Sequence, residues 1–488
     1  MPGPGWRRQH RRNWRPGNLD VKSVQLLGLD FGTTTSGAVI ASANLLRNTV
    51  TGRTELSQVA ECFRSDLVFT PYLGERLDER QIEEYLDSWL KAGGVRQEEL
   101  FGGGALLTGL TAQAENAAGL IALIRRRLGD ALVASADDPC LESWLAFMGS
   151  CAGLSRRYPD RPIINLDIGG GTTNLALGLN GEVLATGCLF VGARHVQVDA
   201  GSYRLVKLSR YGRALLDSLQ ISKQPGDELS AADVDVILGF YVHLLENAVA
   251  GNRQAFQSEI ACLHEQIAFR PGDYMNPIVT LSGGVGELVY GHAQGKPWPA
   301  TTVFGDLGID LAWRLHDLPN WGKFWKSYPP ESAGRATVYG LLRHGTQISG
   351  ATVFLPHPEI LPLADVPILG TIGSDSPESH LRQLLDLARR SQRGGALRVE
   401  LADPNPETVR DFGTKLADTL QDYPAEHPLV LFTPHNIGKT LGHYATAWGA
   451  LPLRLVVVDE IAVKNAQYAR LGELREQVIP VFVYGMRE

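Results

Sequence analysis

The chain has 488 residues, a length that predicts two to four domains rather than one compact core. Its hydrophobic share of 44 % and charged share of 20 % are typical of a soluble globular protein, and no apolar run reaches the roughly 20 residues that span a bilayer. The net charge of −7 argues against a nucleic-acid partner, because binding phosphate backbones needs a basic surface, and the five scattered cysteines fit a reducing cytoplasm.

The first 20 residues form the one strongly basic stretch of the sequence. They begin like a signal peptide but lack the apolar segment that would follow, so they do not indicate secretion. Their proline, glycine and arginine content predicts a disordered tail over residues 1–20. A docking or nucleic-acid role for this tail stays open because it carries Trp6 and Trp14.

Two similar strand–turn–strand units follow. The first runs from Val24 to Ser42 and contains LDFGTTTSG, and the second begins at Ile163 and contains LDIGGGTTN. In the second unit Asn180-Gly181 separates two apolar runs, which is a strong hairpin signal. One supersecondary unit repeated at domain spacing predicts two similar lobes.

The sequence between the two units is mostly helical in pattern. Apolar residues recur at helical spacing over residues 79–91 and 112–128, and the run Gly102-Gly103-Gly104 interrupts this pattern. After the second unit, residues 229–249 predict another helix, with Ser230 as its N-cap.

Helix and strand patterns alternate from about Leu361 to the end of the chain, which suggests an appended α/β domain. We therefore expect a basic tail, a first lobe with a helical insertion, a second lobe and a C-terminal α/β domain. The predicted limits of these four parts are residues 1–20, 21–158, 159–358 and 359–488.

The first turn, Asp30 and Gly32 followed by Thr33-Thr34-Thr35, has the residues of a phosphate-binding loop. Glycine at a bend leaves successive backbone N–H groups pointing one way, and threonine hydroxyls add further donors. The Asp30 carboxylate repels phosphate, so it would act through Mg²⁺ or its water shell. An ordinary hairpin turn explains one such copy about as well, whereas two copies at domain spacing favour phosphate binding.

The second turn, Asp167 followed by Gly169-Gly170-Gly171 and Thr172-Thr173, is the more specific of the two. Three consecutive glycines let a backbone approach a ligand closely, and a structural strand has no use for them. If the lobes face each other, both aspartates converge on one metal–phosphate group. Either Asp30 or Asp167 could then orient or deprotonate the attacking water, so both are candidate catalytic and metal-binding residues.

A third glycine-rich turn, from Ser282 to Glu287, follows a strand and opens a helix. Gly283, Gly284 and Gly286 could let an adenine ring lie against the backbone, and a helix N-terminus favours anionic groups. The alternative is a tight turn capped by Ser282.

Other patterns indicate less. Residues 436–440, NIGKT, are similar to the end of a P-loop, but that motif needs glycine at the position of Thr433. The histidines show no paired-ligand spacing, so the sequence does not indicate a zinc site. The tryptophan-rich run over residues 313–326 fits a partner surface and simple packing about equally well.

With these motifs in view, the chain resembles the ethanolamine ammonia-lyase reactivating factor family, the EutA proteins, within the actin-like ATPase superfamily. The resemblance extends over residues 24–488. Besides the phosphate turns, its main segments are TGLTAQAENA (108–117), LSGGVGE (281–287) and VVVDEIAVKNAQYARLG (456–472). The chain departs from the family pattern at Leu110, where an acidic residue is expected, and this puts the role of that loop in doubt.

The resemblance implies an α/β fold of duplicated actin-like (ribonuclease-H-like) ATPase lobes with a C-terminal α/β extension. It also implies a chaperone-like, slow ATPase that acts on ethanolamine ammonia-lyase and releases damaged cobalamin so that intact coenzyme can bind. ATP and Mg²⁺ would bind this chain, whereas adenosylcobalamin belongs to the partner enzyme. The expected location is the cytoplasm, without a membrane or nucleic-acid partner. Association with a bacterial microcompartment and a homodimer both stay open.

Carried over by position, the resemblance assigns Mg²⁺ and the phosphates to the first two turns and the nucleoside to the third. The first group comprises Asp30, Gly32, Thr33, Thr34, Asp167, Gly169, Gly170, Thr172 and Thr173, and the second comprises Gly283, Gly284 and Glu287.

Two other functions stay open. A small-molecule kinase on the same fold would need a polar substrate pocket and a general base for the acceptor hydroxyl, and no additional acidic motif is evident at either turn. An actin-like scaffold protein would need self-complementary surfaces.

Overall fold

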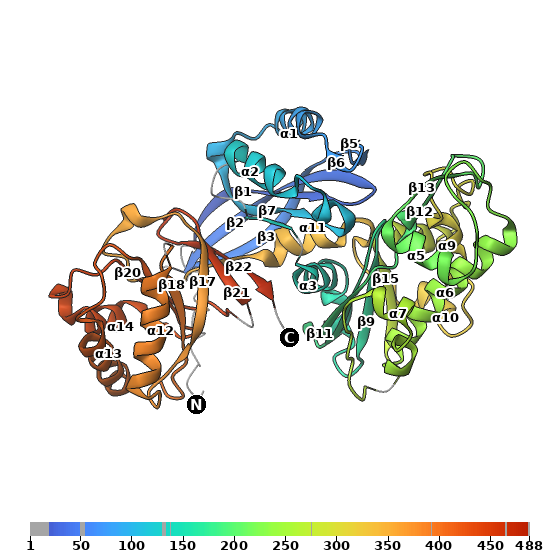
Figure 1. Ribbon diagram of the computed structural model, residues 1–488. Helices are drawn as coiled ribbons and strands as arrows, with labels where there is room; N and C mark the ends of the chain where they lie inside the picture. The colour runs from blue at the N-terminus through green and yellow to red at the C-terminus, as the bar shows by residue number, and fades with distance from the viewer. Residues whose placement is uncertain are drawn as a thin grey trace, which may run out of the picture.

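The computed structural model describes residues 19–48, 54–128, 133–136, 138–274, 276–391, 393–463 and 466–486. Helices and strands form three bodies, which Figure 1 shows next to one another. We call them the first lobe (blue), the second lobe (green to yellow) and the C-terminal unit (orange to red). Within these ranges no helix combines the length and apolar character that crossing a membrane requires.

The first lobe is built on one mixed sheet. Its strands are β1 (Leu19–Phe31), β2 (Thr35–Asn48), β3 (Thr54–Arg64), β4 (Val68–Phe69), β7 (Leu100–Leu107) and β8 (Val133–Ala136). They lie in the order β3-β2-β1-β7-β8, and β4 pairs with β2. The strands β1, β2 and β3 are antiparallel neighbours, whereas β7 runs parallel to β1 and β8 parallel to β7. Helices α1 (Glu79–Gly93) and α2 (Ala117–Leu128) pack on this sheet through an apolar core.

The second lobe repeats this arrangement. Its strands are β9 (Ile163–Ile168), β10 (Thr173–Leu179), β11 (Glu182–Leu189), β14 (Glu265–Ile267) and β15 (Ile278–Ser282), in the order β14-β11-β10-β9-β15. The series β11-β10-β9-β15 has the same strand order and directions as β3-β2-β1-β7. The structure therefore confirms the duplicated α/β lobes. It also confirms the Asn180-Gly181 hairpin, whose two turn residues have φ of 50° and 82°.

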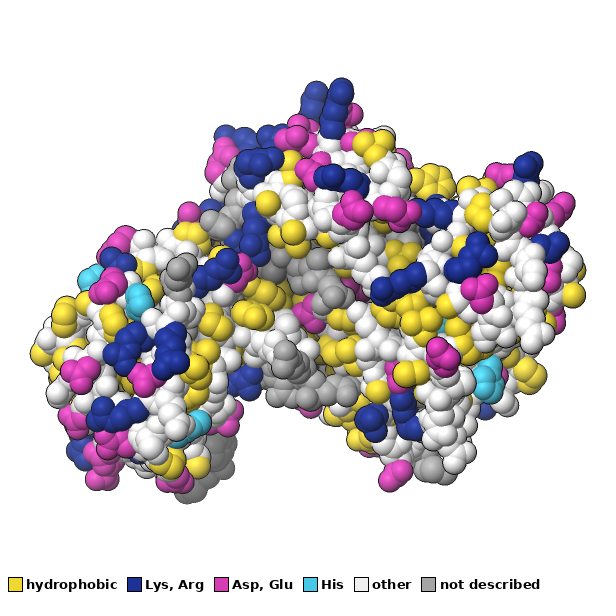
Figure 2. Space-filling model, viewed as in Figure 1, with side chains coloured by type: hydrophobic (Ala, Val, Ile, Leu, Met, Phe, Trp, Pro, Cys, Tyr) yellow, Lys and Arg dark blue, Asp and Glu magenta, His cyan; other side chains and the backbone are white. Residues whose placement is uncertain are grey.

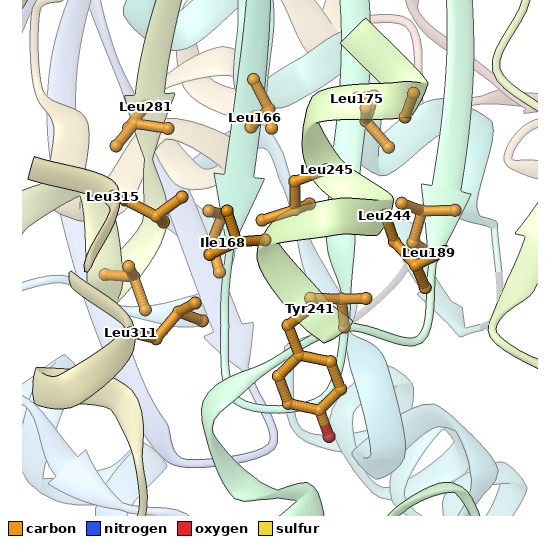
Figure 3. Packing of buried hydrophobic residues seen from close by; sticks show 14 of the residues in the cluster. Leu166, Ile168, Leu175, Leu189, Tyr241, Leu244, Leu245, Leu281, Leu311 and Leu315 are labelled. Atoms are coloured by element: carbon orange, nitrogen blue, oxygen red, sulfur yellow. The ribbon is translucent and has the colours of Figure 1, made fainter. Parts of the chain in front are cut away.

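The core of the second lobe lies between its sheet and two helices, α6 (Ala231–Val249) and α9 (Gly308–His316). Figure 3 shows Leu244 and Leu245 of α6 and Leu311 and Leu315 of α9 beside the leucines of the strands. The start of α6 has the predicted N-cap, because the Ser230 hydroxyl accepts from the Asp233 N–H and the Asp233 carboxylate accepts from the Ser230 N–H. The other helices of this lobe are α5 (Arg210–Ser218), α7 (Glu259–Leu263), α8 (Gly283–Ala293) and α10 (Gly322–Ser327).

Two helices pack against a different lobe from the one to which the predicted domain limits assign them. Helix α3 (Pro139–Ser150), which α4 (Ala152–Arg157) follows, contributes Phe147 and Met148 to the core of the second lobe. Helix α11 (Ala336–Gly340) places Val338 and Tyr339 against Leu26 of the first lobe. The chain thus crosses twice between the lobes, and the domain limits given above stay a prediction.

Within the described residues, the C-terminal unit contains a seven-stranded sheet in the order β16-β22-β21-β17-β18-β19-β20. These strands are Thr346–Ile348 (β16), Leu363–Ile372 (β17), Gly395–Val399 (β18), Leu429–Phe432 (β19), Leu455–Val458 (β20), Ala466–Leu471 (β21) and Pro480–Met486 (β22). From β17 to β20 the strands are parallel and alternate with α12 (Glu378–Arg390), α13 (Pro406–Leu420) and α14 (Gly438–Ala445). This is the helix–strand alternation that the sequence predicts.

Ion pairs and hydrogen bonds fasten the C-terminal unit to the first lobe. Arg125 on α2 donates to both carboxylate oxygens of Asp365 on β17, at 3.2 and 3.0 Å. Arg475 donates to the carbonyl oxygen of Leu100 at 2.6 Å. Both arginines are partly buried, which makes such bonds stronger than exposed ones.

One local prediction needs correction, and one open alternative can be compared with the structure. Gly102-Gly103-Gly104 lie inside the buried strand β7 rather than in a break between helices. The reason is close packing, since Gly103 has φ of 124° and a Cβ there would lie 2.9 Å from the backbone nitrogen of Leu27. In the tryptophan-rich run Trp321 and Trp325 are buried in the core, which leaves Trp313 exposed.

Strand β1 begins at Leu19, inside the predicted tail. The rest of that tail, residues 1–18, lies outside the described residues. On the face shown in Figure 2, Lys and Arg side chains alternate with Asp and Glu side chains over all three bodies. This mixture agrees with the modest net charge of −7.

Candidate functional site

A cavity of about 410 Å³ lies between the two lobes, and all three glycine-rich turns line it. The structure brings together there the predicted residues Asp30, Gly32, Thr33, Thr34, Thr35, Asp167, Gly169, Gly170, Gly171, Thr172, Gly283, Gly284 and Glu287. They come from the ends of β1, β9 and β15, because equivalent strand ends of the two sheets face the same space.

Two predicted residues do not line the cavity. The buried Thr173 hydroxyl donates to the carbonyl oxygen of Val191 at 2.8 Å, so it secures the neighbouring strand. Gly286 lies on the side of α8 that faces the sheet, where a Cβ would be 2.8 Å from the carbonyl carbon of Leu281. Its small size serves the packing of the helix on β15.

The first two turns close in the same way. The N–H of Gly32 donates to the carbonyl oxygen of Thr35 at 3.0 Å, and the N–H of Gly169 donates to the carbonyl oxygen of Thr172 at 2.9 Å. These equivalent bonds leave two similar loops, residues 32–35 and 169–172, opposite each other across the cavity. We call them the first and the second loop.

The two loops also touch each other. A Cβ on Gly171 would lie 2.7 Å from Oγ1 of Thr33 and 2.8 Å from Cγ of Leu110, and a Cβ on Gly170 would collide with Thr34. The glycines of the second loop therefore permit contact between the lobes. From the sequence, these glycines are expected to let the backbone approach a ligand closely. In the structure they let the two loops approach each other.

The carboxyl group of Asp30 is held by two threonines. Thr108 donates to Oδ1 and Thr337 donates to Oδ2, each at 3.2 Å. Burial raises the pKa of Asp30 from 3.8 to about 6, although these hydrogen bonds oppose the rise. Asp30 thus lies where the nearby protein makes its negative charge unfavourable.

Asp167 occupies the equivalent place in the second lobe. The hydroxyl of Ser282 donates to its Oδ1 at 2.6 Å. Burial and, to a smaller extent, repulsion by Asp30 raise the pKa of Asp167 to about 7. Ser282 makes no side-chain cap bond at the start of α8, so its predicted capping role is wrong and its hydroxyl serves Asp167.

A third carboxyl group, that of Glu142, faces the same cavity from α3. It is buried, and Oε2 accepts from Nδ2 of Asn174 at 2.9 Å. Burial raises its pKa well above the ordinary value, and repulsion by Asp30 adds to the rise. None of the sequence motifs points to Glu142. The available signal was one carboxylate within the apolar helix PCLESWLAFMGS, because a buried unpaired charge is rare.

The cavity is also lined by residues outside the three turns. His292, Lys296, Phe304 and Asp306 are among them. Asp306 accepts from the N–H of Gly308 at 2.9 Å, and burial raises its pKa. An apolar ring, a lysine and a carboxyl group thus belong to the lining of the cavity beside the turns.

The residues present fit a magnesium ion. Mg²⁺ binds hard oxygen ligands and is usually held by one or two carboxylates together with water and phosphate oxygens. Asp30, Asp167 and Glu142 place three carboxyl groups around one cavity, and each has a raised pKa. Oδ1 of Asn174 is buried there without a hydrogen-bond partner in the described structure. No cluster of three His, Cys, Asp or Glu side chains forms a ready-made metal cage among the described residues.

The segment that is similar to a P-loop has another arrangement. The N–H of Gly438, at the start of α14, donates to the hydroxyl of Thr352 at 3.0 Å. Thr433 is buried, and its N–H donates to the carbonyl oxygen of Val458 at 3.0 Å. The donors that would cradle a phosphate are therefore used within the protein.

The solved structures that match this chain share little of its sequence. An exopolyphosphatase from Cytophaga hutchinsonii is 14 % identical with a TM-score of 0.34, covering 62 % of this chain and 91 % of the other. The MreB 5 protein of Spiroplasma citri bound to AMPPNP is 15 % identical with a TM-score of 0.29, covering 60 % of this chain and 96 % of the other.

Sequence relatives match over nearly the full length. An ethanolamine ammonia-lyase reactivase EutA from Salmonella typhimurium (strain LT2) is 29 % identical over 479 residues, covering 95 % of this chain and 98 % of the relative. The protein of the same name from Escherichia coli (strain K12) is 28 % identical over 474 residues, with the same coverage of 95 % and 98 %. The model of the family described as "Ethanolamine utilisation protein EutA" matches residues 22–486. Because this match covers almost the whole chain, the protein belongs to the EutA family.

Proposed function

We propose that this protein is an ATP-dependent reactivating factor for ethanolamine ammonia-lyase. It releases damaged cobalamin from that enzyme so that intact adenosylcobalamin can bind. Membership of the EutA family supports the partner, because the relatives are named as reactivases of ethanolamine ammonia-lyase. The observation that carries the nucleotide part is the pair of facing loops, with the three carboxyl groups of Asp30, Asp167 and Glu142 around one cavity between the lobes.

In this proposal the two loops bind the nucleotide phosphates through backbone N–H groups and threonine hydroxyls. Asp30 and Asp167 hold Mg²⁺ directly or through water, and bound Mg²⁺ neutralises the phosphate charge that the carboxylates would repel. Gly283, Gly284 and Glu287 contact the nucleoside. The buried carboxyl groups support this assignment, since a cation offsets the cost of ionising them.

Glu142 is the best candidate for the hydrolytic base. Its carboxyl group lies in the same cavity as both aspartates, and Asn174 fixes one of its oxygens. A raised pKa makes a carboxylate a stronger base, which suits removal of a proton from an attacking water near neutral pH. Asp30 and Asp167 are less suited to this step because the proposal uses them for the metal.

The coupling to the partner enzyme works through lobe closure. The loops touch across the cavity, so the nucleotide bound between them changes how the lobes approach each other. Closure then changes the affinity for ethanolamine ammonia-lyase. The available free energy is limited by the difference in nucleotide affinity between the open and closed forms.

The test uses ethanolamine ammonia-lyase that cyanocobalamin has inactivated. The purified protein, ATP, Mg²⁺ and fresh adenosylcobalamin should together restore ethanolamine turnover, and omission of ATP or of the protein should prevent it. Failure of the full mixture to restore turnover contradicts the proposal. Transfer of phosphate to a sugar or polyol in the same preparation would favour the kinase alternative instead.

A further inference from the structure

Residues 193–195 form a segment behind the second loop, and they make hydrogen bonds to the carbonyl groups of all three glycines in that loop. The N–H of Ala193 donates to the carbonyl oxygen of Gly169 at 3.1 Å, and the N–H of Arg194 donates to that of Gly170 at 2.7 Å. The imidazole Nε2 of His195 lies 2.8 Å from the carbonyl oxygen of Gly171. Three successive residues thus bind three successive carbonyl groups, two through the backbone and the third through a side chain.

This arrangement sets the direction of the loop. The N–H groups of Gly170, Gly171 and Thr172 are bonded to no acceptor within the described part of the chain, and these residues line the cavity. Because the carbonyl groups are held on the opposite side, the loop presents its donors to the cavity. An anionic ligand is attracted by such donors and repelled by carbonyl oxygens.

The contact between loop and segment is close. A Cβ on Gly192 would lie 2.5 Å from the carbonyl oxygen of Gly170 and 2.8 Å from the carbonyl carbon of Gly171. Only glycine at position 192 allows the two backbones to approach in this way. The contact is therefore built by the segment as well as by the loop.

The surroundings of His195 decide which ring nitrogen carries the proton. The side chain is fully buried, and desolvation, with a smaller contribution from His264, lowers its pKa to about 3. The ring is therefore neutral near pH 7 and has one N–H. The carbonyl oxygen of Gly171 can only accept, so Nε2 carries the hydrogen and donates it. Nδ1 then accepts from the hydroxyl of Ser209, which lies 2.7 Å away.

Ser209 is itself fixed. Its Oγ accepts from the N–H of Gly212 at 3.0 Å as the N-cap of α5, and its N–H donates to the carbonyl oxygen of His195 at 3.0 Å. A continuous line of hydrogen bonds thus runs from the start of α5 through His195 to the second loop. His195 ties the loop to a helix that does not line the cavity.

We propose that His195 is a positioning residue that keeps the N–H groups of the second loop directed at the phosphates of the nucleotide. The identity of the ligand in this inference rests on the proposed nucleotide site. The hydrogen bonds that hold the loop, from residues 193–195, do not depend on any ligand. Without the His195 donor the carbonyl group of Gly171 is left buried and without a hydrogen bond, which costs free energy. We expect the peptide group to rotate so that this carbonyl group finds another donor. A turned peptide removes a donor from the phosphate side of the cavity.

The experiment compares His195→Leu with His195→Gln and His264→Leu. Leucine fills much of the space but donates no hydrogen bond, whereas glutamine can place an N–H near the position of Nε2. His264 is the matched control, since it is a mostly buried imidazole whose ring centre lies 6.4 Å from that of His195 and whose Nδ1 bonds to Ile260 rather than to the loop. Dissociation constants for ATP, ADP and adenosine are measured by calorimetry.

His195→Leu should weaken ATP and ADP binding about tenfold, the effect of losing roughly one hydrogen bond to a charged group, and should leave adenosine binding unchanged. His195→Gln should recover most of the lost ATP affinity, and His264→Leu should keep the wild-type ratio of ATP to adenosine affinity. Equal weakening of ATP and adenosine, or no weakening of either, overturns the positioning role.

Amide hydrogen exchange without nucleotide separates this inference from the proposed function. In His195→Leu the N–H groups of Ala193 and Arg194 should exchange faster than in the wild type, and in His264→Leu they should not. Unchanged exchange overturns the hold on the loop. If exchange behaves as expected but the wild type binds neither ATP nor ADP, the proposed nucleotide site is wrong, whereas the role of His195 in holding the loop is supported. Should His195→Leu not fold, Ser209→Ala must show the same exchange difference.

Discussion

The hydroxyl of Ser282 lies 2.6 Å from Oδ1 of Asp167 and donates a hydrogen bond to it. Ser282 is fully buried, and its Oγ also accepts from Nδ2 of Asn165 at 2.9 Å. Asp167 is therefore fixed by a hydroxyl group that has its own support within the second lobe. Because this bond favours the ionised carboxylate, it assists the binding of a cation at Asp167.

Ser282→Ala should weaken Mg²⁺-dependent ATP binding about tenfold, since a hydrogen bond to a charged group contributes about 1.5 kcal/mol or more. Calorimetric titrations of ATP with and without Mg²⁺ measure this difference. Ser282→Thr keeps the hydroxyl and should stay close to the wild type. If Mg²⁺ increases the ATP affinity of Ser282→Ala as much as that of the wild type, the role of this bond is refuted.

Glu142→Gln and Asp167→Ala should fail in different ways. Glutamine can still accept from Asn174 but cannot take a proton, so ATP should bind while its hydrolysis falls about 10²–10⁴-fold. Asp167→Ala should abolish hydrolysis of Mg-ATP and also the Mg²⁺-dependent part of binding, with an unchanged circular dichroism spectrum. Rapid hydrolysis by Glu142→Gln would exclude Glu142 as the base, and hydrolysis by Asp167→Ala would exclude the metal site.

The raised pKa of Asp30 predicts how stability depends on pH in the nucleotide-free protein. The unfolded chain releases this proton near pH 3.8 and the folded protein releases it near pH 6. Between these values the folded state binds more protons, so Asp30 stabilises the protein below pH 4 and loses this effect as the pH rises through 6. The difference corresponds to about 3 kcal/mol.

Asp30→Asn removes that dependence, so the variant should gain stability relative to the wild type between pH 4 and 7. The difference between the two proteins is the quantity to measure, by urea unfolding at each pH. Buried His195 has a lowered pKa and gives the opposite trend below pH 6.5, but it contributes equally to both proteins. A difference that stays constant with pH would show that Asp30 is not held in this way.

Contact between the two loops predicts an effect of one methyl group. Gly170→Ala places a Cβ against Oγ1 of Thr34 in the other lobe, and this collision should hold the lobes apart. Small-angle scattering should then give a larger radius of gyration. The double variant Gly170→Ala, Thr34→Ala removes the colliding atom and should restore the wild-type value. A single variant as compact as the wild type would contradict the contact.

Local chemistry explains the parts of the fold that the sequence predicts well. Asn180-Gly181 can adopt the positive φ angles of a tight hairpin, and Ser230 with Asp233 forms a cap from residues three positions apart. The two glycine–threonine turns repeat one local pattern, so the residues that these turns place around the cavity are visible in the sequence. These signals do not depend on how distant segments pack.

The missed features depend on distant segments. Glu142 lies on a helix that begins far from either turn, and it joins the site only because α3 packs against the second lobe. The glycine run of β7 has the sequence pattern of a break, since the requirement for glycine at position 103 comes from the Leu27 backbone on the neighbouring strand. Ser282 has the sequence context of an N-cap, and only the pairing of β15 with β9 brings it beside Asp167.

The ties from Arg125 to Asp365 and from Arg475 to Leu100 give the C-terminal unit a mechanical role. They fasten it to the first lobe, on the side away from the second lobe in Figure 1. The unit also packs against α3 through β22, so it contacts a helix of the second lobe as well. In the proposed closure, a rotation of the first lobe relative to the second would therefore act on the C-terminal unit at both contacts.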